Sequence, residues 1–136
     1  MKNNFKYFLL IIFLILNALQ SAKANEPFVF DVTEIEILEN GNQINGYKGG
    51  TVVSEDGSKI IAESFYYNKL TNILEAEGNV SYINNEKNTI ITSDKAIYLK
   101  NEEKIFTKGN SKAVSKDRSK IIAESFYYNK LTNILE

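Results

Sequence analysis

The chain has 136 residues, a formal net charge of −1, and neither cysteine nor histidine. Without histidine it lacks the commonest general base and every serine–histidine–aspartate or cysteine–histidine arrangement, and carboxylates alone are a poor ligand set for a transition metal. A weakly acidic chain also lacks the basic surface that binds nucleic acid or anionic lipid. We therefore expect no catalytic residue, no cofactor, no metal and no nucleic-acid partner.

The first 24 residues have the pattern of a Sec signal peptide. Two lysines give a positive start, an apolar run from Phe8 to Leu16 follows, and small residues precede a cleavage site between Ala24 and Asn25. The apolar run is short for a membrane span, which needs about 20 residues; an uncleaved anchor is the alternative. We expect export by a Sec signal peptide and a mature domain that covers residues 25–136.

Alternating apolar residues from Phe28 to Leu38 predict a first strand, and a change of parity near Thr33 and Glu34 indicates a bulge or bend. A second strand is expected from Ile44 to Val53. The polar residues 54–58, which include an Asp-Gly pair, then predict a tight turn that closes a hairpin. The mature chain is thus expected to open with an antiparallel strand pair.

A string of eighteen residues, SKIIAESFYYNKLTNILE, occurs twice without change, from Ser58 to Glu75 and from Ser119 to Glu136. A looser version runs from Thr89 to Thr107. Each unit contains an outgoing strand, a polar turn and a returning strand, so the repeat predicts a stack of strand pairs. The further strands are expected at 59–67, 73–83, 89–100 and 104–114, with a turn at 115–118.

The returning strand from Ile73 to Ile83 has one dry and one wet face, because its side chains alternate between apolar and polar types. Alanine, glutamate and leucine in the repeat would also suit a helix, but the apolar positions fit a period of two better than 3.6. The third copy stops at Glu136, in the middle of its returning strand. That leaves an unpaired edge, so we expect a piece of a longer protein or a truncated product; a genuine terminus is the alternative.

Large apolar side chains recur at matching places in successive strand pairs. They either fill the core of a sandwich or solenoid, or line an apolar trough along a stack that is bent into a V. A trough would suit an extended apolar ligand, because binding sites are concave and mostly apolar.

Two parts of each unit resemble the OstA-like (organic solvent tolerance) domain of the lipopolysaccharide transport proteins. The family pattern is roughly I-x-A-D-x-x-x-Y, a turn, and a returning strand with A-x-G-N-V. Residues 61–68 followed by 74–80 are similar to the whole pattern, and Ser93 to Leu99 are similar to its first half. The resemblance covers residues 28–136.

Some positions depart from the family pattern. Asp94 occupies the acidic place in the middle unit, whereas Glu63 and Glu124 replace the aspartate in the two identical copies. Gly109 and Asn110 match the second half, but serine follows them where the pattern has valine.

The resemblance implies a V-shaped antiparallel β-jellyroll in the periplasm, associated with the outer membrane. It implies that the acyl chains of lipid A, within lipopolysaccharide, lie in the apolar trough and pass along it toward the outer membrane without any reaction. The residues implied to line this lipid groove are Phe65, Tyr67, Leu74, Val80, Tyr82, Ala96, Tyr98, Ile105, Phe126 and Tyr128. The alternative function is a structural β-solenoid or adhesin-like domain with a filled core.

The resemblance also implies partners. Jellyroll domains of the Lpt proteins join edge to edge, so an open terminal strand would be a joining surface. A cleavable signal argues against the anchored LptC type. We favour the periplasmic N-terminal part of an LptD-type protein, whose outer-membrane barrel would be a further partner, over a short LptA-type carrier.

Overall fold

The computed structural model describes residues 26–115 and 119–136. The predicted signal peptide, its cleavage site at Ala24 and Asn25, and most of the turn expected at 115–118 lie outside the described residues. In the described part, no helix is long and apolar enough to cross a membrane.

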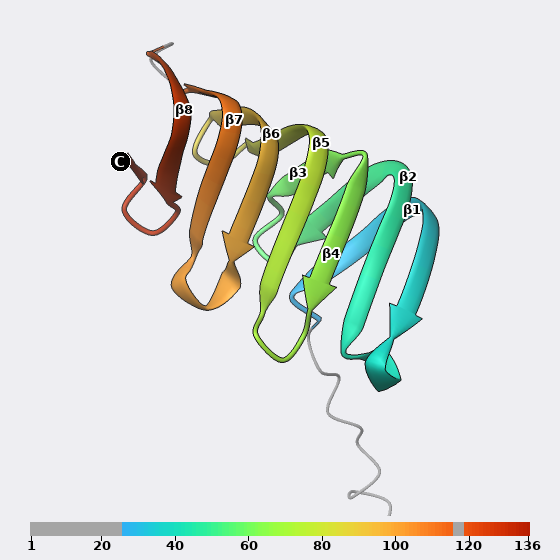
Figure 1. Ribbon diagram of the computed structural model, residues 1–136. Coiled ribbons are helices and arrows are strands. Elements are labelled where there is room, and N and C mark those ends of the chain that lie inside the picture. The colour runs from blue at the N-terminus through green and yellow to red at the C-terminus, as the bar shows by residue number, and fades with distance from the viewer. Residues whose placement is uncertain (1–25, 116–118) are drawn as a thin grey trace, which may run out of the picture.

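One antiparallel sheet of nine strands makes up the fold, in the order β1-β2-β3-β5-β6-β7-β8-β9, and β4 continues β3 between β2 and β5 (Figure 1). The bounds are β1 Phe28–Leu38, β2 Gln43–Ser54, β3 Lys59–Ala62, β4 Ser64–Asn68, β5 Ile73–Asn84, β6 Thr89–Leu99, β7 Lys104–Val114, β8 Lys120–Asn129 and β9 Ile134–Leu135, with short 3-10 turns η1 Glu39–Gly41 and η2 Lys100–Glu102. The predicted all-β class is therefore confirmed. The strand expected at 59–67 differs in one respect, because it is broken into β3 and β4 at Glu63.

Asparagine side chains and backbone conformations determine the shape of the turns in the repeat. In the repeated NKLTN segment, the Asn68 side chain accepts hydrogen bonds from the backbone N–H groups of Leu70 and Thr71, at 2.9 and 3.1 Å. Asn129 does the same in the second copy. The last residue of each turn, Asn72 or Asn133, has a positive φ of 54° or 60°, which asparagine tolerates better than most residues. Identical sequence thus produces identical turns.

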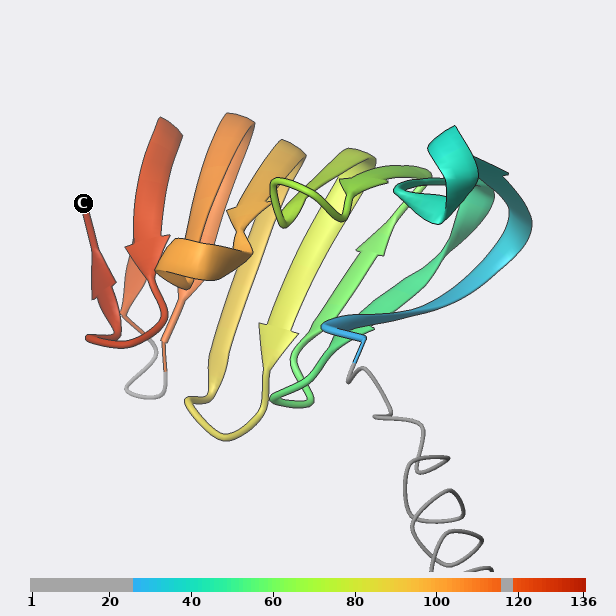
Figure 2. The same ribbon diagram turned by 90° about the horizontal axis from the view of Figure 1, so that it is seen from below.

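The strands bend over along one line that crosses the sheet. Register shifts lie there in four strand pairs, between Val32 and Glu34 in β1, Glu77 and Val80 in β5, Thr92 and Lys95 in β6, and Lys108 and Ser111 in β7. The break between β3 and β4 lies on the same line. Figures 1 and 2 show the strands side by side from β1 to β8, with the long strands curved and with β3 and β4 as separate short pieces. The bend predicted near Thr33 is confirmed as part of this line.

The bend divides the sheet into two leaves joined at a corner. The first leaf comprises 28–32, 50–54, 59–62, 80–84, 89–93, 111–114 and 120–123, and the second leaf comprises 34–38, 43–47, 64–68, 73–77, 95–99, 104–108, 125–129 and 134–135. We call the side opposite the corner, where the turns of the two leaves face each other, the mouth.

Glycine and asparagine form the corner on the returning strands. Gly78 and Asn79 have positive φ angles of 82° and 47°. A Cβ added to Gly78 would lie 2.5 Å from a carboxylate oxygen of Glu63, so the neighbouring strand leaves room only for glycine. Asn79 Nδ2 then donates to the same carboxylate at 2.6 Å.

The same corner recurs in the next unit. Gly109 and Asn110 have φ angles of 77° and 48°, the Asp94 carboxylate lies against Gly109, and Asn110 Nδ2 donates to it at 2.8 Å. The acidic residue and the Gly-Asn pair of the repeat are therefore two halves of one bend.

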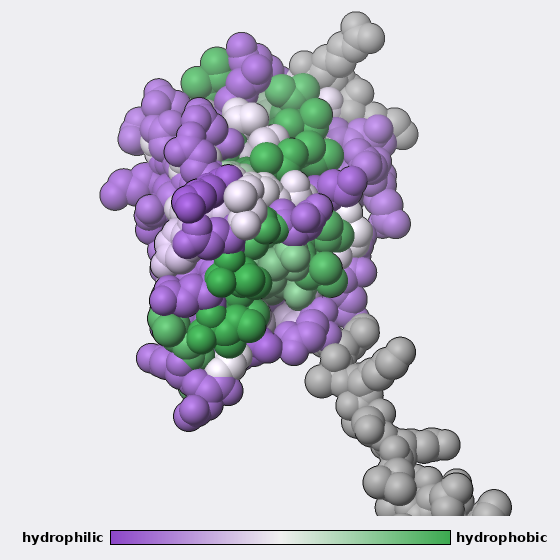
Figure 3. Space-filling view, turned by 90° about the vertical axis from the view of Figure 1, so that its right-hand side faces the viewer, coloured by the Kyte–Doolittle hydropathy of each residue, from purple (hydrophilic) through white to green (hydrophobic). Residues whose placement is uncertain are grey.

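The inward side chains of the two leaves pack against each other. The ring centroid of Phe28, in the first leaf, lies 5.0 Å from that of Tyr67 and 5.4 Å from that of Tyr98, both in the second leaf. Because a β1 residue meets β4 and β6, the leaves are offset along the stack. At the β1 end the second leaf is consequently uncovered: Ile35 and Ile37 are 50% and 62% exposed, and apolar side chains gather on this end of the molecule (Figure 3).

Candidate functional site

All ten residues predicted to line a trough lie in the interior between the leaves. Their exposed fractions are between 1% and 6%, and they belong to one core cluster of 18 buried residues. Val80 and Tyr82 belong to the first leaf, and the other eight belong to the second. Their role as the lining of a lipid groove stays a prediction.

The geometry of the corner explains why the predicted residues face the interior on both sides of the bend. On a returning strand such as β5, two residues fill the corner, so Ala76 and Val80 keep the same parity and both face inward. On an outgoing strand such as β6, one acidic residue occupies the corner, and inward positions change parity between Ser93 and Ala96. Among the inward residues that sequence reasoning left out, Ile60, Ala62 and Ile91 lie on the first-leaf side of this change. Ala76 and Ala113, on returning strands, keep the inward parity and were also left out.

The tyrosines bridge the apolar interior and the polar mouth. The hydroxyls of Tyr67, Tyr98 and Tyr128 each donate to the residue five positions later, which is Asn72 at 2.9 Å, Glu103 at 2.5 Å and Asn133 at 2.8 Å. In the first leaf, the Tyr82 hydroxyl lies 3.2 Å from Ser58 Oγ, and Asn84 Nδ2 donates to both at 3.3 and 3.0 Å. Each tyrosine ring is thus buried between the leaves, while its hydroxyl reaches the polar residues at the mouth.

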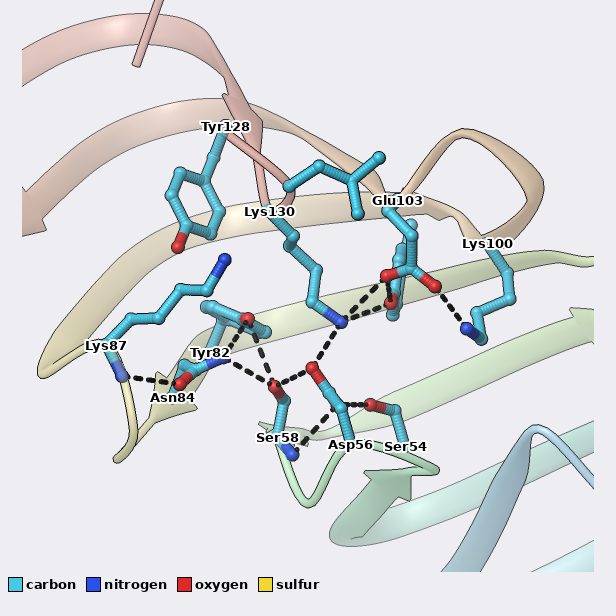
Figure 4. Close-up of polar contacts among 12 residues, drawn as sticks. Ser54, Asp56, Ser58, Tyr82, Asn84, Lys87, Lys100, Glu103, Tyr128 and Lys130 are labelled. Atoms are coloured by element: carbon cyan, nitrogen blue, oxygen red, sulfur yellow. Dashed lines mark hydrogen bonds and ion pairs between the residues drawn. The ribbon is translucent and has the colours of Figure 1, made fainter. Parts of the chain in front are cut away.

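At the mouth, one lysine joins the two leaves (Figure 4). Lys130, in the turn after β8, is 3% exposed. Its Nζ lies 2.8 Å from Oδ2 of Asp56, in the turn between β2 and β3, and 3.0 Å from Oε2 of Glu103, between β6 and β7. Nζ also donates to the Tyr98 hydroxyl and lies 4.6 Å from the centroid of that ring. Sequence reasoning took Asp56 only as a turn residue and did not single out Lys130.

Both carboxylates keep further partners within their own leaf. Asp56 accepts hydrogen bonds from the Ser54 hydroxyl, and from the Ser58 backbone N–H and hydroxyl at 3.1 and 2.9 Å. Glu103 accepts from Lys100 and from Tyr98. Lys130 is therefore the charged group that connects two separately supported acids.

The electrostatics of this cluster follow from burial and hydrogen bonding. Burial by itself would raise the pKa of the Asp56 carboxyl, but hydrogen bonds from Lys130, Ser54 and Ser58 outweigh it and hold that pKa well below its usual range. Burial opposes ionisation of Glu103 too, yet Lys100, Tyr98 and Lys130 lower its pKa. Burial, and then the neighbouring Glu103, raise the pKa of the Tyr98 hydroxyl. At neutral pH the acids are charged and the tyrosine is neutral.

No group of three or more acidic, histidine or cysteine side chains within 26–115 and 119–136 could hold a metal ion. In these residues, a closed apolar interior lies between the two leaves. The hydrogen-bonded corner bounds it on one side, and the polar residues of the mouth bound it on the other.

Comparison with known proteins identifies the architecture. No protein-family model matches the sequence, and no curated protein matches it. Among solved structures, the chain is similar to LptH from Pseudomonas aeruginosa, described as the LptA homologous periplasmic component of the conserved lipopolysaccharide transport device. The TM-score is 0.71, the sequence identity is 11%, and the match covers 82% of this chain and 81% of LptH.

This chain has the LptA-like β-jellyroll fold. The fold that the sequence resemblance implied is therefore confirmed. The match is to an LptA homologue, and the preference for the LptD type stays a prediction.

Proposed function

We propose that this chain is a periplasmic lipopolysaccharide transport module, which carries the acyl chains of lipid A in the interior between its leaves. The observation that carries the proposal is the likeness to LptH over 82% of the chain. The ten inward residues support it, because they form one continuous apolar strip across β4 to β8. The sugars and phosphates would stay in water outside the mouth, and no bond would be made or broken.

Association with other jellyroll domains is part of the same proposal. The two outermost strands of the sheet are β1 and β9, and an open strand can pair with a strand of another chain. The uncovered Ile35 and Ile37 would be buried by a domain that continued the stack at the β1 end.

A photo-crosslinking amino acid at Phe65 or Tyr98, incorporated in cells, tests the proposal. We expect adducts that carry lipopolysaccharide at both inward positions. The matched controls are Glu75 and Asn79, whose side chains lie on the outer face and at the corner and which should give none. Silence at the inward positions with adducts at the controls would overturn the proposal.

A second candidate function is a structural β-solenoid with a permanently filled core. One observation favours it: no inward residue of the predicted strip is more than 6% exposed. For this candidate, neither inward nor outer positions would give lipopolysaccharide adducts, and the interior would stay closed in the presence of lipid.

A further inference from the structure

Any guest between the leaves must separate them, because the interior side chains already contact one another. At the corner the leaves cannot separate, because strands such as β5, β6 and β7 run without a break from one leaf into the other. The leaves can part more readily at the mouth, where their free turns meet. The groups that cross the mouth therefore decide how easily the interior opens.

Lys130 crosses the mouth in a buried position. Its own turn is fixed to the second leaf, because its backbone N–H donates to the carbonyl of Glu103 at 2.9 Å. The side chain then reaches the first leaf through its 2.8 Å contact with Asp56. The pair is partly buried, because the Lys130 side chain is 4% accessible and that of Asp56 is 42% accessible. A partly buried pair is screened less by salt than an exposed one, so this contact joins the two leaves at the mouth.

The identical repeat copy supplies an internal comparison. Lys69 has the same place in the first NKLTN turn, and its Nζ lies 3.0 Å from the carboxylate of Glu26, which precedes the first-leaf part of β1. That pair is more exposed, mainly on the lysine side: Lys69 is 30% accessible against 4% for Lys130, whereas the acids Glu26 and Asp56 are 53% and 42% accessible. Exposed pairs contribute little, so Lys69 should connect the leaves less firmly than Lys130, which is buried and also contacts Glu103 and Tyr98.

We propose that Lys130 is a latch, which holds the mouth closed through Asp56 and is released when acyl chains enter between the leaves. The proposal rests on the proposed function and specifies how its site is regulated. Release leaves no carboxylate stranded, because Asp56 keeps Ser54 and Ser58 while Glu103 keeps Lys100 and Tyr98. The freed ammonium group turns into water, so the mouth can open and close reversibly.

The test uses the purified protein with two added cysteines, at Glu86 on the first-leaf rim and Asn101 on the second-leaf rim, both exposed. The chain has no cysteine of its own, so spin labels attach only there and report the distance across the mouth. The same background carries Lys130→Met, Asp56→Asn as a second and milder variant, and Lys69→Met as the matched control. Uptake is measured with fluorescently labelled lipopolysaccharide.

We expect Lys130→Met and Asp56→Asn to lengthen or broaden the distance distribution and to speed uptake about fivefold or more, because binding improves as the open state becomes more populated. Lys69→Met should behave as the unaltered protein does. Wild-type distances and uptake rates in both latch variants would overturn the latch. If the latch variants open the mouth but no variant takes up lipopolysaccharide, the latch stands and the proposed function fails.

Discussion

At the scale of single residues, the repeat motif is a device for bending a sheet. Glu63 and Asp94 place their carboxylates over the glycine of the next strand and accept a hydrogen bond from the asparagine that follows it. Two successive residues with positive φ turn the strand, and the acid satisfies the amide at the turn. The acidic residue and the Gly-Asn pair of the motif therefore shape the bend, and they lie at the corner, away from the interior.

The corner predicts a specific cost for adding one methyl group. Gly78→Ala should lower the free energy of unfolding by about 2–3 kcal/mol, because strained backbone and a clash with Glu63 act together. Gly57→Ala is the matched control: its φ is also positive, at 78°, but nothing lies within 4 Å of an added Cβ. It should cost about 1 kcal/mol. Urea denaturation of both variants checks this, and equal losses would show that the contact with Glu63 does not matter.

The two acids at the mouth, Asp56 and Glu103, predict how the stability of the fold depends on pH. The folded pKa values of Asp56 and Glu103 lie below their ordinary values, so their stabilising contribution is complete above the unfolded pKa of about 4. It is lost as the pH falls from there toward the lower folded values. The free energy of unfolding should thus decline below pH 4, and Lys130→Met should flatten that decline. An unchanged slope in the variant would show that Lys130 does not set these pKa values.

At the scale of elements, the sequence was sufficient to predict the strands, turns and bends that depend on residues close together in the chain. The period of two in β5, the asparagine turns and the parity change at Thr33 all depend on neighbouring residues, and the structure contains each of them. The break at Glu63 was not predicted, because it is needed only when Gly78 of the next strand approaches. The bridge from Lys130 to Asp56 was missed for a similar reason, since it joins turns that are distant in the chain and that separately resemble solvated charged loops.

Equivalent substitutions in the two identical copies should change the free energy of unfolding by different amounts. Leu74 in β5 is 1% exposed and lies between two strands, whereas Leu135, its equivalent in β9, is partly buried at the end of the sheet. Leu74→Ala should cost about 2–5 kcal/mol, and Leu135→Ala less than half of the same loss. Denaturant unfolding of the pair measures this directly. Equal losses would mean that the end of the stack is packed as firmly as its centre.

At the scale of the whole molecule, the offset between the leaves gives the two ends different characters. At the β1 end the second leaf extends beyond the first, which exposes the inward Ile35 and Ile37. At the β8 end the first leaf extends, and the inward Ile121 is 44% exposed. An end with an uncovered second leaf is complementary to an end with an uncovered first leaf. Under the proposed association, copies or related jellyrolls would therefore join head to tail with a continuous interior, which a two-fold symmetric contact would not provide.

This complementarity predicts which isoleucine controls association. Ile37 and Ile122 are similarly exposed, at 62% and 67%, but Ile37 faces the interior of the stack whereas Ile122 lies on the outer face of β8. Ile37→Ser should weaken self-association, measured by sedimentation over a range of concentrations, about fivefold or more, because it removes apolar surface that only a joined domain would bury. Ile122→Ser should leave association unchanged, and both variants should unfold at nearly the wild-type denaturant concentration, since both side chains are mostly in water. Equal effects of the two substitutions would point to nonspecific hydrophobic contact, and a stronger effect of Ile122→Ser would place the contact on the outer face.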